Sequence, residues 1–160
     1  DETGYILVLR PVLLDAYKSI EESVGLKIPK ELILTLLRQI NRCLEILRCE
    51  EEIIDNFEVR DNINNAEMII TKLFLLIAEP YEREKVVLFV TIAEFLVLRD
   101  LVYCNYSLPH LKVKMAPHIL KTYKKFYDDI ESIFNMLEQA EVKAYWDYIR
   151  NYNTKDNTLH

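Results

Sequence analysis

Glycine is scarce in this sequence, with two residues (Gly4 and Gly25) among 160, beside five prolines. β-Sandwiches and Rossmann-type domains use glycine at many turns, where the backbone adopts conformations that a Cβ atom disfavours. The chain also contains neither GxGxxG nor GxxxxGK[ST], which excludes nucleotide pockets built on glycine-rich phosphate loops. The scarcity of glycine therefore favours long helices joined by short connections.

Cysteine is sparse too, and its spacing is not that of a zinc site or a disulfide framework. Cys43, Cys49 and Cys104 lie in apolar segments with helical periodicity and form no CxxC pair. An odd number of cysteines in such surroundings indicates reduced, buried thiols in an intracellular protein, either cytoplasmic or nuclear. The chain as given shows no signal-peptide pattern, so we expect none.

Long hydrophobic runs are also missing. The longest, VVLFVTIAEFLVL at 86–98, has thirteen residues and includes Thr91 and Glu94. A membrane span needs about 20 apolar residues. This run therefore predicts a buried helix and no membrane span.

Most of the chain shows the spacing of amphipathic helices, and its composition, 51% hydrophobic and 29% charged, suits one globular domain. We predict an all-α, single-domain bundle of five to seven helices over residues 1–150, followed by a flexible C-terminal tail at 151–160. The expected helices cover about 11–24, 29–57, 65–78, 83–104, 117–137 and 139–150. The polar run RDNINN at 60–65 predicts the clearest break, with Asn64 and Glu67 forming a capping box for the helix that follows.

Two of the expected helices are apolar on nearly all sides. Only a helix enclosed by others can bury such a surface, so we place the helix at about 83–104 in the centre of the bundle. This position predicts almost complete burial of Phe89, Ile92, Phe95 and Leu96. The helix at 65–78 either packs beside it or presents a candidate partner interface that includes some of Ile69, Leu73, Leu76 and Ile77.

The sequence contains no recognisable catalytic arrangement of histidine, serine or cysteine. No serine or cysteine lies in a GxSxG-like setting. Cys104, His110 and His118 do not have the spacing of zinc ligands, and no fourth ligand is evident. We therefore predict no catalytic residue, no metal site and no cofactor.

A Mg²⁺-dependent, all-helical nucleotide hydrolase is the weakest of the alternatives that we keep. It requires carboxylates that converge from neighbouring helices. The pattern would be Glu52-x-x-Asp55 with Glu79-x-x-Glu82, but Pro80 interrupts the second pair. Acidic runs of this kind are usually solvated faces of helices.

The strongest charge feature is the basic segment HLKVKMAPHILKTYKK, residues 110–125, with five lysines, two histidines and no acid. Residues 111–125 carry +5, which leaves −11 on the rest of a chain of net charge −6. In an extended LKVKM both lysines point the same way, and the lysines of the following helix lie opposite its apolar side. The candidate contact residues are Lys112, Lys114, His118, Lys121, Lys124 and Lys125.

Two interpretations of the basic segment remain open. Cations are unfavourable near a helix N-terminus, so the lysines either dock against the protein's own acidic helices or contact a phosphate, nucleic acid or acidic partner. We expect a non-enzymatic protein–protein interaction or assembly module, an adaptor or small subunit that binds a protein partner or a second copy of itself. A nucleic-acid-backbone or phosphate-binding subunit is the first alternative, disfavoured because the charge of −11 elsewhere repels a long polyanion.

Overall fold

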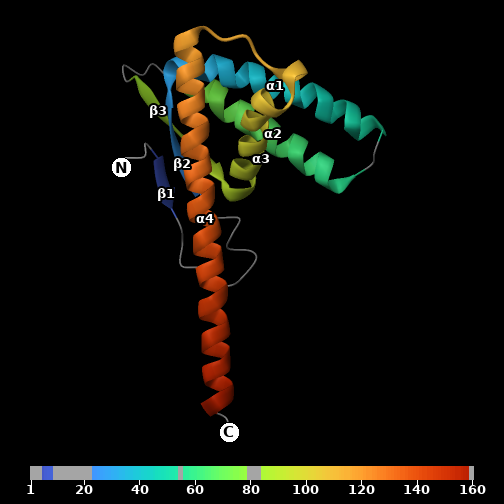
Figure 1. Ribbon diagram of the computed structural model, residues 1–160. Helices are drawn as coiled ribbons and strands as arrows, with labels where there is room; N and C mark the ends of the chain where they lie inside the picture. Colours follow the sequence, from blue (N-terminus) through green and yellow to red (C-terminus); the bar gives the residue numbers. More distant parts are fainter. Residues whose placement is uncertain (1–4, 9–22, 54–55, 79–83, 159–160) are drawn as a thin grey trace.

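The computed structural model describes residues 5–8, 23–53, 56–78 and 84–158, and the chain is mostly helical, as predicted (Figure 1). The elements of these ranges, in order, are β1 (Tyr5–Val8), β2 (Ser23–Pro29), α1 (Lys30–Ile53), α2 (Phe57–Ala78), β3 (Lys85–Thr91), α3 (Ile92–Ser107), the 3₁₀ turn η1 (Pro109–Leu111) and α4 (Pro117–Thr158). These ranges thus contain four α-helices, not five to seven, together with a three-stranded sheet that the sequence prediction lacks. No helix among these residues has the length and hydropathy needed to cross a membrane.

The sheet is antiparallel, with β2 between β1 and β3. Residues of β3 alternate between buried and more exposed positions, and those of β2 do so except at the buried Gly25, as expected for strands covered mainly on one face. On the outer face, Phe89 pairs with Gly25 and is 51% exposed. On the face that belongs to the helix-covered core, the buried cross-strand pairs are Val24 with Val90, Leu26 with Leu88 and Ile28 with Val86.

The predicted central helix is divided into a strand and a helix, and the division lies at Thr91. The Thr91 hydroxyl accepts a hydrogen bond from the Glu94 N–H (3.1 Å), and Glu94 Oε1 accepts one from the Thr91 N–H (2.9 Å). This reciprocal capping box begins α3 at Ile92. The β-branched and aromatic residues before it pair as strand β3.

This division corrects the burial prediction for three of four residues. Phe95, on the inner side of α3, is fully buried. Ile92 is half-buried, Leu96 is 41% exposed, and Phe89 lies on the outer face of the sheet. An all-round apolar segment is thus explained by a strand and a helix that each bury one side.

The second predicted helix, 29–57, corresponds to α1, which ends earlier, at Ile53, and buries one apolar side over its first half. Its buried members are Leu32, Ile33, Leu36, Leu37, Ile40, Cys43 and Leu44. The first predicted helix, 11–24, differs, because Ser23 and Val24 belong to β2, and the rest of its range up to residue 22 lies outside the described residues.

Helix α2 begins at Phe57, eight residues before the predicted start at 65. Asn56 Oδ1 accepts a hydrogen bond from the Glu58 N–H (2.8 Å), so Asn56 occupies the capping role predicted for Asn64. The run RDNINN lies inside α2 because Ile63 continues its buried stripe and the polar residues around it face outward.

Helix α4 is one helix of 42 residues where two helices and a flexible tail are predicted. Its N-terminal half packs on α3, and its C-terminal half extends beyond the sheet and the other helices (Figure 1). Arg99 of α3 donates to both carboxylate oxygens of Glu131 (2.7 and 3.3 Å) and lies 3.7 Å from the ring centroid of Phe134. The helix continues to Thr158, and the flexibility of residues 151–160 stays a prediction.

Tyr123 provides a test of how α4 packs on α3. Its ring is fully buried, and its Oη donates to the Val102 carbonyl oxygen at 2.7 Å. Changing Tyr123→Phe keeps the ring and removes this hydrogen bond, so we expect the free energy of unfolding to fall by about 1 kcal/mol in a urea titration. The control Tyr145→Phe alters a ring that is 58% exposed, and should change stability by less than about 0.5 kcal/mol. Equal losses in the two variants would contradict this packing.

Candidate functional site

The basic segment is held against the helices by the residues between its lysines. Val113 is buried, and its N–H donates to Asn105 Oδ1 at 2.9 Å. Arg42 of α1 donates through Nη1 to the Lys112 carbonyl oxygen at 2.6 Å. Lys112 and Lys114, on either side of Val113, are both exposed, as the alternation in LKVKM predicts.

The remaining basic residues lie on the outer side of the first turns of α4. Tyr123 and Phe126 are buried on the opposite side and fix the orientation of the helix. The exposed residues of the outer side include His118, Lys121, Lys124 and Lys125.

Two of these lysines line a cleft where α4 begins, close to the starts of α1 and β3 (Figure 1). The Lys30 N–H donates to the Glu84 carbonyl oxygen at 2.9 Å, which ties α1 to the residue before β3. This lysine cleft has a volume of about 800 Å³, and its lining consists of Pro29, Lys30, Glu31, Glu84, Lys85, Lys121, Thr122 and Lys125. Four lysines from three separate segments therefore surround one cleft that also contains two glutamates.

The lysines of the basic segment have little compensation from the protein's own acids. Within the described ranges, no carboxylate forms an ion pair with Lys112, Lys114, Lys121 or Lys124. Ion pairs in these ranges instead join Arg48 with Glu67, Lys72 with Glu94, Arg99 with Glu131, and Arg150 with Asp147. Within these ranges the four lysines therefore make none of the ion pairs that docking against acidic helices of the same chain would use.

Asp129 is an acidic group beside the lysine cleft. It lines a small adjoining hollow together with Lys85 and Lys125. Burial raises the pKa of its carboxyl above the usual range, while the charges of Lys125 and Lys85 act in the opposite direction. One carboxylate thus partly offsets two cations of the cleft.

Lys30 and Lys85 are the two lysines of the cleft that the sequence did not predict as contact residues. No local pattern marks them, because their proximity depends on the pairing of β2 with β3, which sets Pro29 opposite Lys85. Conversely, the predicted contact residues that are exposed but do not line the cleft are Lys112, Lys114, His118 and Lys124.

Of the four residues named for a possible partner interface on the third predicted helix, two are buried, one is half-buried and one is exposed. Ile69 and Leu73 are fully buried in the core, so neither can contact a partner. Leu76 is half-buried and Ile77 is 45% exposed. The exposed apolar side chains of α2 are Phe57, Met68, Phe74, Leu75 and Ile77.

The C-terminal half of α4 also exposes large side chains, among them Val142, Tyr145, Trp146 and Tyr148. Trp146 is the single tryptophan and is 53% exposed, so fluorescence reports on this half of the helix alone. We expect an emission maximum close to that of free tryptophan and efficient quenching by acrylamide. A strongly blue-shifted, protected emission from the monomer would contradict the exposure of this half of α4.

Few side chains in the described parts of the chain are placed to act together as metal ligands. No group of three or more His, Cys, Asp or Glu side chains there could hold a metal ion. Of the carboxylates considered for Mg²⁺, Glu52 is exposed near the end of α1, and Asp55, Glu79 and Glu82 lie outside the described residues. His110, exposed in η1, and His118 make no such group with the half-buried Cys104.

No protein-family model matches the chain, and neither a curated protein nor a solved structure is significantly similar to it.

Proposed function

We propose that this protein is a non-enzymatic interaction module whose lysine cleft binds an acidic segment of another protein. The observation that carries the proposal is the convergence of Lys30, Lys85, Lys121 and Lys125 on one cleft. These lysines come from three segments far apart in the sequence, so their proximity is a property of the fold and not of one charged run.

Electrostatics favours a carboxylate-bearing ligand at this place. The cleft contains more cationic than anionic side chains, in a chain whose net charge is −6. A local potential of opposite sign attracts and orients an acidic segment, raising its association rate and its specificity more than its affinity. Neighbouring Lys124 and, further along the segment, Lys112 and Lys114 extend the positive surface beyond the cleft.

A compact acidic peptide suits the cleft better than a nucleic acid. Its lining residues include no aromatic side chain on which a base could stack and no arginine that could form a bidentate phosphate contact. A long polyanion also meets the net negative charge of the remaining surface, whereas a short acidic segment does not.

A phosphate-backbone ligand remains the second candidate, because lysines at a cleft also neutralise phosphates. Backbone contacts of this kind need no base recognition and would use the same four residues. The two candidates predict opposite preferences between a peptide and a nucleic acid of equal charge.

Fluorescence anisotropy with two labelled probes distinguishes these candidates. The probes are an oligo-glutamate peptide and a single-stranded RNA of the same net charge, each titrated with the full chain. We expect tighter binding to the peptide, and a marked loss of affinity when salt is raised from about 0.1 M to 1 M, where the Debye length falls from about 10 to 3 Å. Tighter binding to the RNA would overturn the proposal in favour of the phosphate candidate, and binding to neither probe would contradict both.

A further inference from the structure

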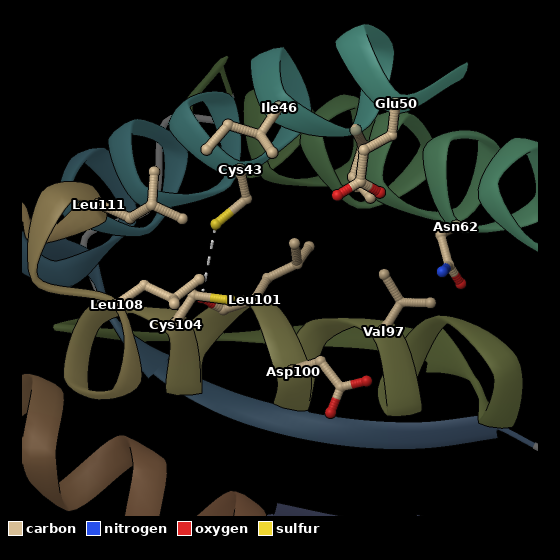
Figure 2. Close-up of a pocket in the computed structure, with 11 residues that line it drawn as sticks. Cys43, Ile46, Glu50, Asn62, Val97, Asp100, Leu101, Cys104, Leu108 and Leu111 are labelled. Atoms are coloured by element: carbon tan, nitrogen blue, oxygen red, sulfur yellow. Dashed lines mark hydrogen bonds between the residues drawn. The ribbon is translucent and has the colours of Figure 1, made fainter. Parts of the chain in front are cut away.

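A pocket separate from the lysine cleft lies between α1, α2 and α3 and has a volume of about 180 Å³ (Figure 2). Its lining is mainly apolar, with Glu50 and Asp100 as its acidic members. Cys43 from α1 and Cys104 from α3 both line it, and Figure 2 shows the two side chains at the same end of the pocket, where Cys43 donates to the Leu101 carbonyl oxygen beside Cys104. Two of the three cysteines of the chain therefore meet at one place, although 60 residues separate them in the sequence.

The two thiols occupy different environments. Cys43 is 4% exposed; its sulfur accepts a hydrogen bond from Gln39 Nε2 (3.5 Å) and lies 3.9 Å from the Leu101 carbonyl oxygen, to which its thiol donates. Cys104, three residues after Leu101, is half-buried and so remains accessible from the pocket. The Leu101 carbonyl that accepts from Cys43 lies one helical turn before Cys104 on α3, and both cysteine side chains line the same pocket.

The closeness of the two thiols makes Cys104 the more reactive of the pair. It lowers the pKa of Cys104 to about 7, against the opposing effects of burial and of the Asp100 carboxylate. The same contact, together with burial, raises the pKa of Cys43, so Cys43 stays a thiol and a donor. Because the thiolate is the nucleophilic form of cysteine, Cys104 reacts first and Cys43 stands beside it as a second thiol.

We propose that Cys43 and Cys104 form a site of oxidative modification, at which a peroxide converts the two thiols into a disulfide bond between α1 and α3. The Cys104 thiolate attacks one peroxide oxygen, the O–O bond breaks, and hydroxide leaves, so sulfur is oxidised to sulfenic acid and the peroxide is reduced. The Cys43 sulfur then attacks the Cys104 sulfur, the S–O bond breaks, and the departing hydroxide takes the Cys43 proton to become water. The overall reaction consumes two thiols and one hydrogen peroxide and yields one disulfide and two waters.

Mass spectrometry of the full chain after mild hydrogen peroxide treatment tests this proposal. Alkylation of the remaining thiols followed by intact mass analysis should show that the free thiols fall from three to one. Peptide mapping should find Cys43 joined to Cys104, and Cys49, exposed on the outer side of α1, still free and alkylated. Oxidation that begins at Cys49, or that leaves Cys43 and Cys104 unlinked in the folded chain, would overturn it.

Three variants separate the roles of the two sulfurs. In Cys43→Ser, a hydroxyl donor replaces the thiol, so Cys104 should still react quickly but stop as a sulfenic acid that dimedone traps. In Cys104→Ser, oxidation of Cys43 should be slower by about tenfold or more, because Cys43 is held as a buried thiol. Cys49→Ser is the matched control and should form the disulfide at the wild-type rate. Equal oxidation rates in Cys104→Ser and wild type would contradict the proposal.

The pH dependence of alkylation gives a readout on the unaltered chain, which does not depend on whether any variant folds. The alkylation rate at Cys104 should be half-maximal near pH 7, where its pKa lies. The titratable groups around the pair are Glu50 from α1, Asp100 from α3 and Tyr123 from α4. Burial raises the pKa of Tyr123, so Tyr123 stays neutral over this range. Slower alkylation of Cys104 than of Cys49 at neutral pH would overturn the assignment of Cys104 as the attacking thiol.

Discussion

Replacing Phe95 by alanine is expected to lower the free energy of unfolding by about 3–5 kcal/mol, the usual cost of removing a fully buried phenylalanine ring. Phe95 is 0% exposed on the inner side of α3, where it belongs to the core cluster that also includes the inner face of the sheet. Its removal leaves a cavity that the surrounding helices and strands can close only in part. Equilibrium unfolding in urea, followed by circular dichroism, measures the loss.

Phe89 is the matched control, because it is the same residue type six positions earlier in the same apolar run. It lies on the outer face of β3 and is 51% exposed, so Phe89→Ala should cost about 1 kcal/mol or less. A loss of 3 kcal/mol or more for both variants would instead support one central helix through residues 83–104 and contradict the strand–helix division at Thr91.

The double change Lys121→Glu with Lys125→Glu is expected to weaken the binding of an acidic peptide by about 100-fold or more. Two attractive contacts become two repulsive ones. Both residues line the lysine cleft, and neither takes part in the core. Stability should change by less than about 1 kcal/mol, since exposed charges contribute little. The largest local cost comes from a glutamate at 125, which would lie one turn from Asp129 and repel it.

The control for the double variant at Lys121 and Lys125 changes the net charge of the protein by the same amount, but at two residues away from the cleft. Arg38→Glu with Lys143→Glu alters two exposed cations that do not line it. We expect this control to keep nearly all the affinity for the peptide. If the control weakens binding as much as the cleft variant does, the attraction depends on net charge alone and the lysine cleft is not the binding site.

Local periodicity was sufficient to predict those parts of the fold in which one side of a helix is buried. The stripe of α1 from Leu32 to Leu44 and the outward lysines of α4 follow directly from spacing along the chain. The same reasoning was wrong for residues 86–98, because a strand followed by a helix produces a continuous apolar run that resembles one buried helix. The capping box of Thr91 and Glu94 was the local signal that marks this division, and it stands in the printed sequence.

Features that depend on tertiary contacts could not be predicted from the spacing of residues along the sequence. The polar run around Asn64 lies within α2 because the neighbouring Ile63 packs in the core, which no local rule reports. Lys30 and Lys85 meet the basic segment only through the register of β2 and β3. The position of Cys43 and Cys104 at one pocket likewise requires α1 and α3 to lie side by side. Spacing along the chain predicts three buried thiols, which is wrong for Cys49, since it is exposed, and for Cys104, since it is half-buried.

The most direct test of the central claim locates the bound peptide on the protein. Oligo-glutamate peptide is titrated into the uniformly ¹⁵N-labelled full chain, and the amide chemical shifts are followed at moderate salt. The account predicts that the largest shift changes lie at Lys30, Lys85, Lys121 and Lys125 and at their immediate neighbours, and that they diminish as salt is raised. Changes centred on residues 142–149 of α4 or on the exposed face of α2, with the cleft amides unaffected, would contradict it.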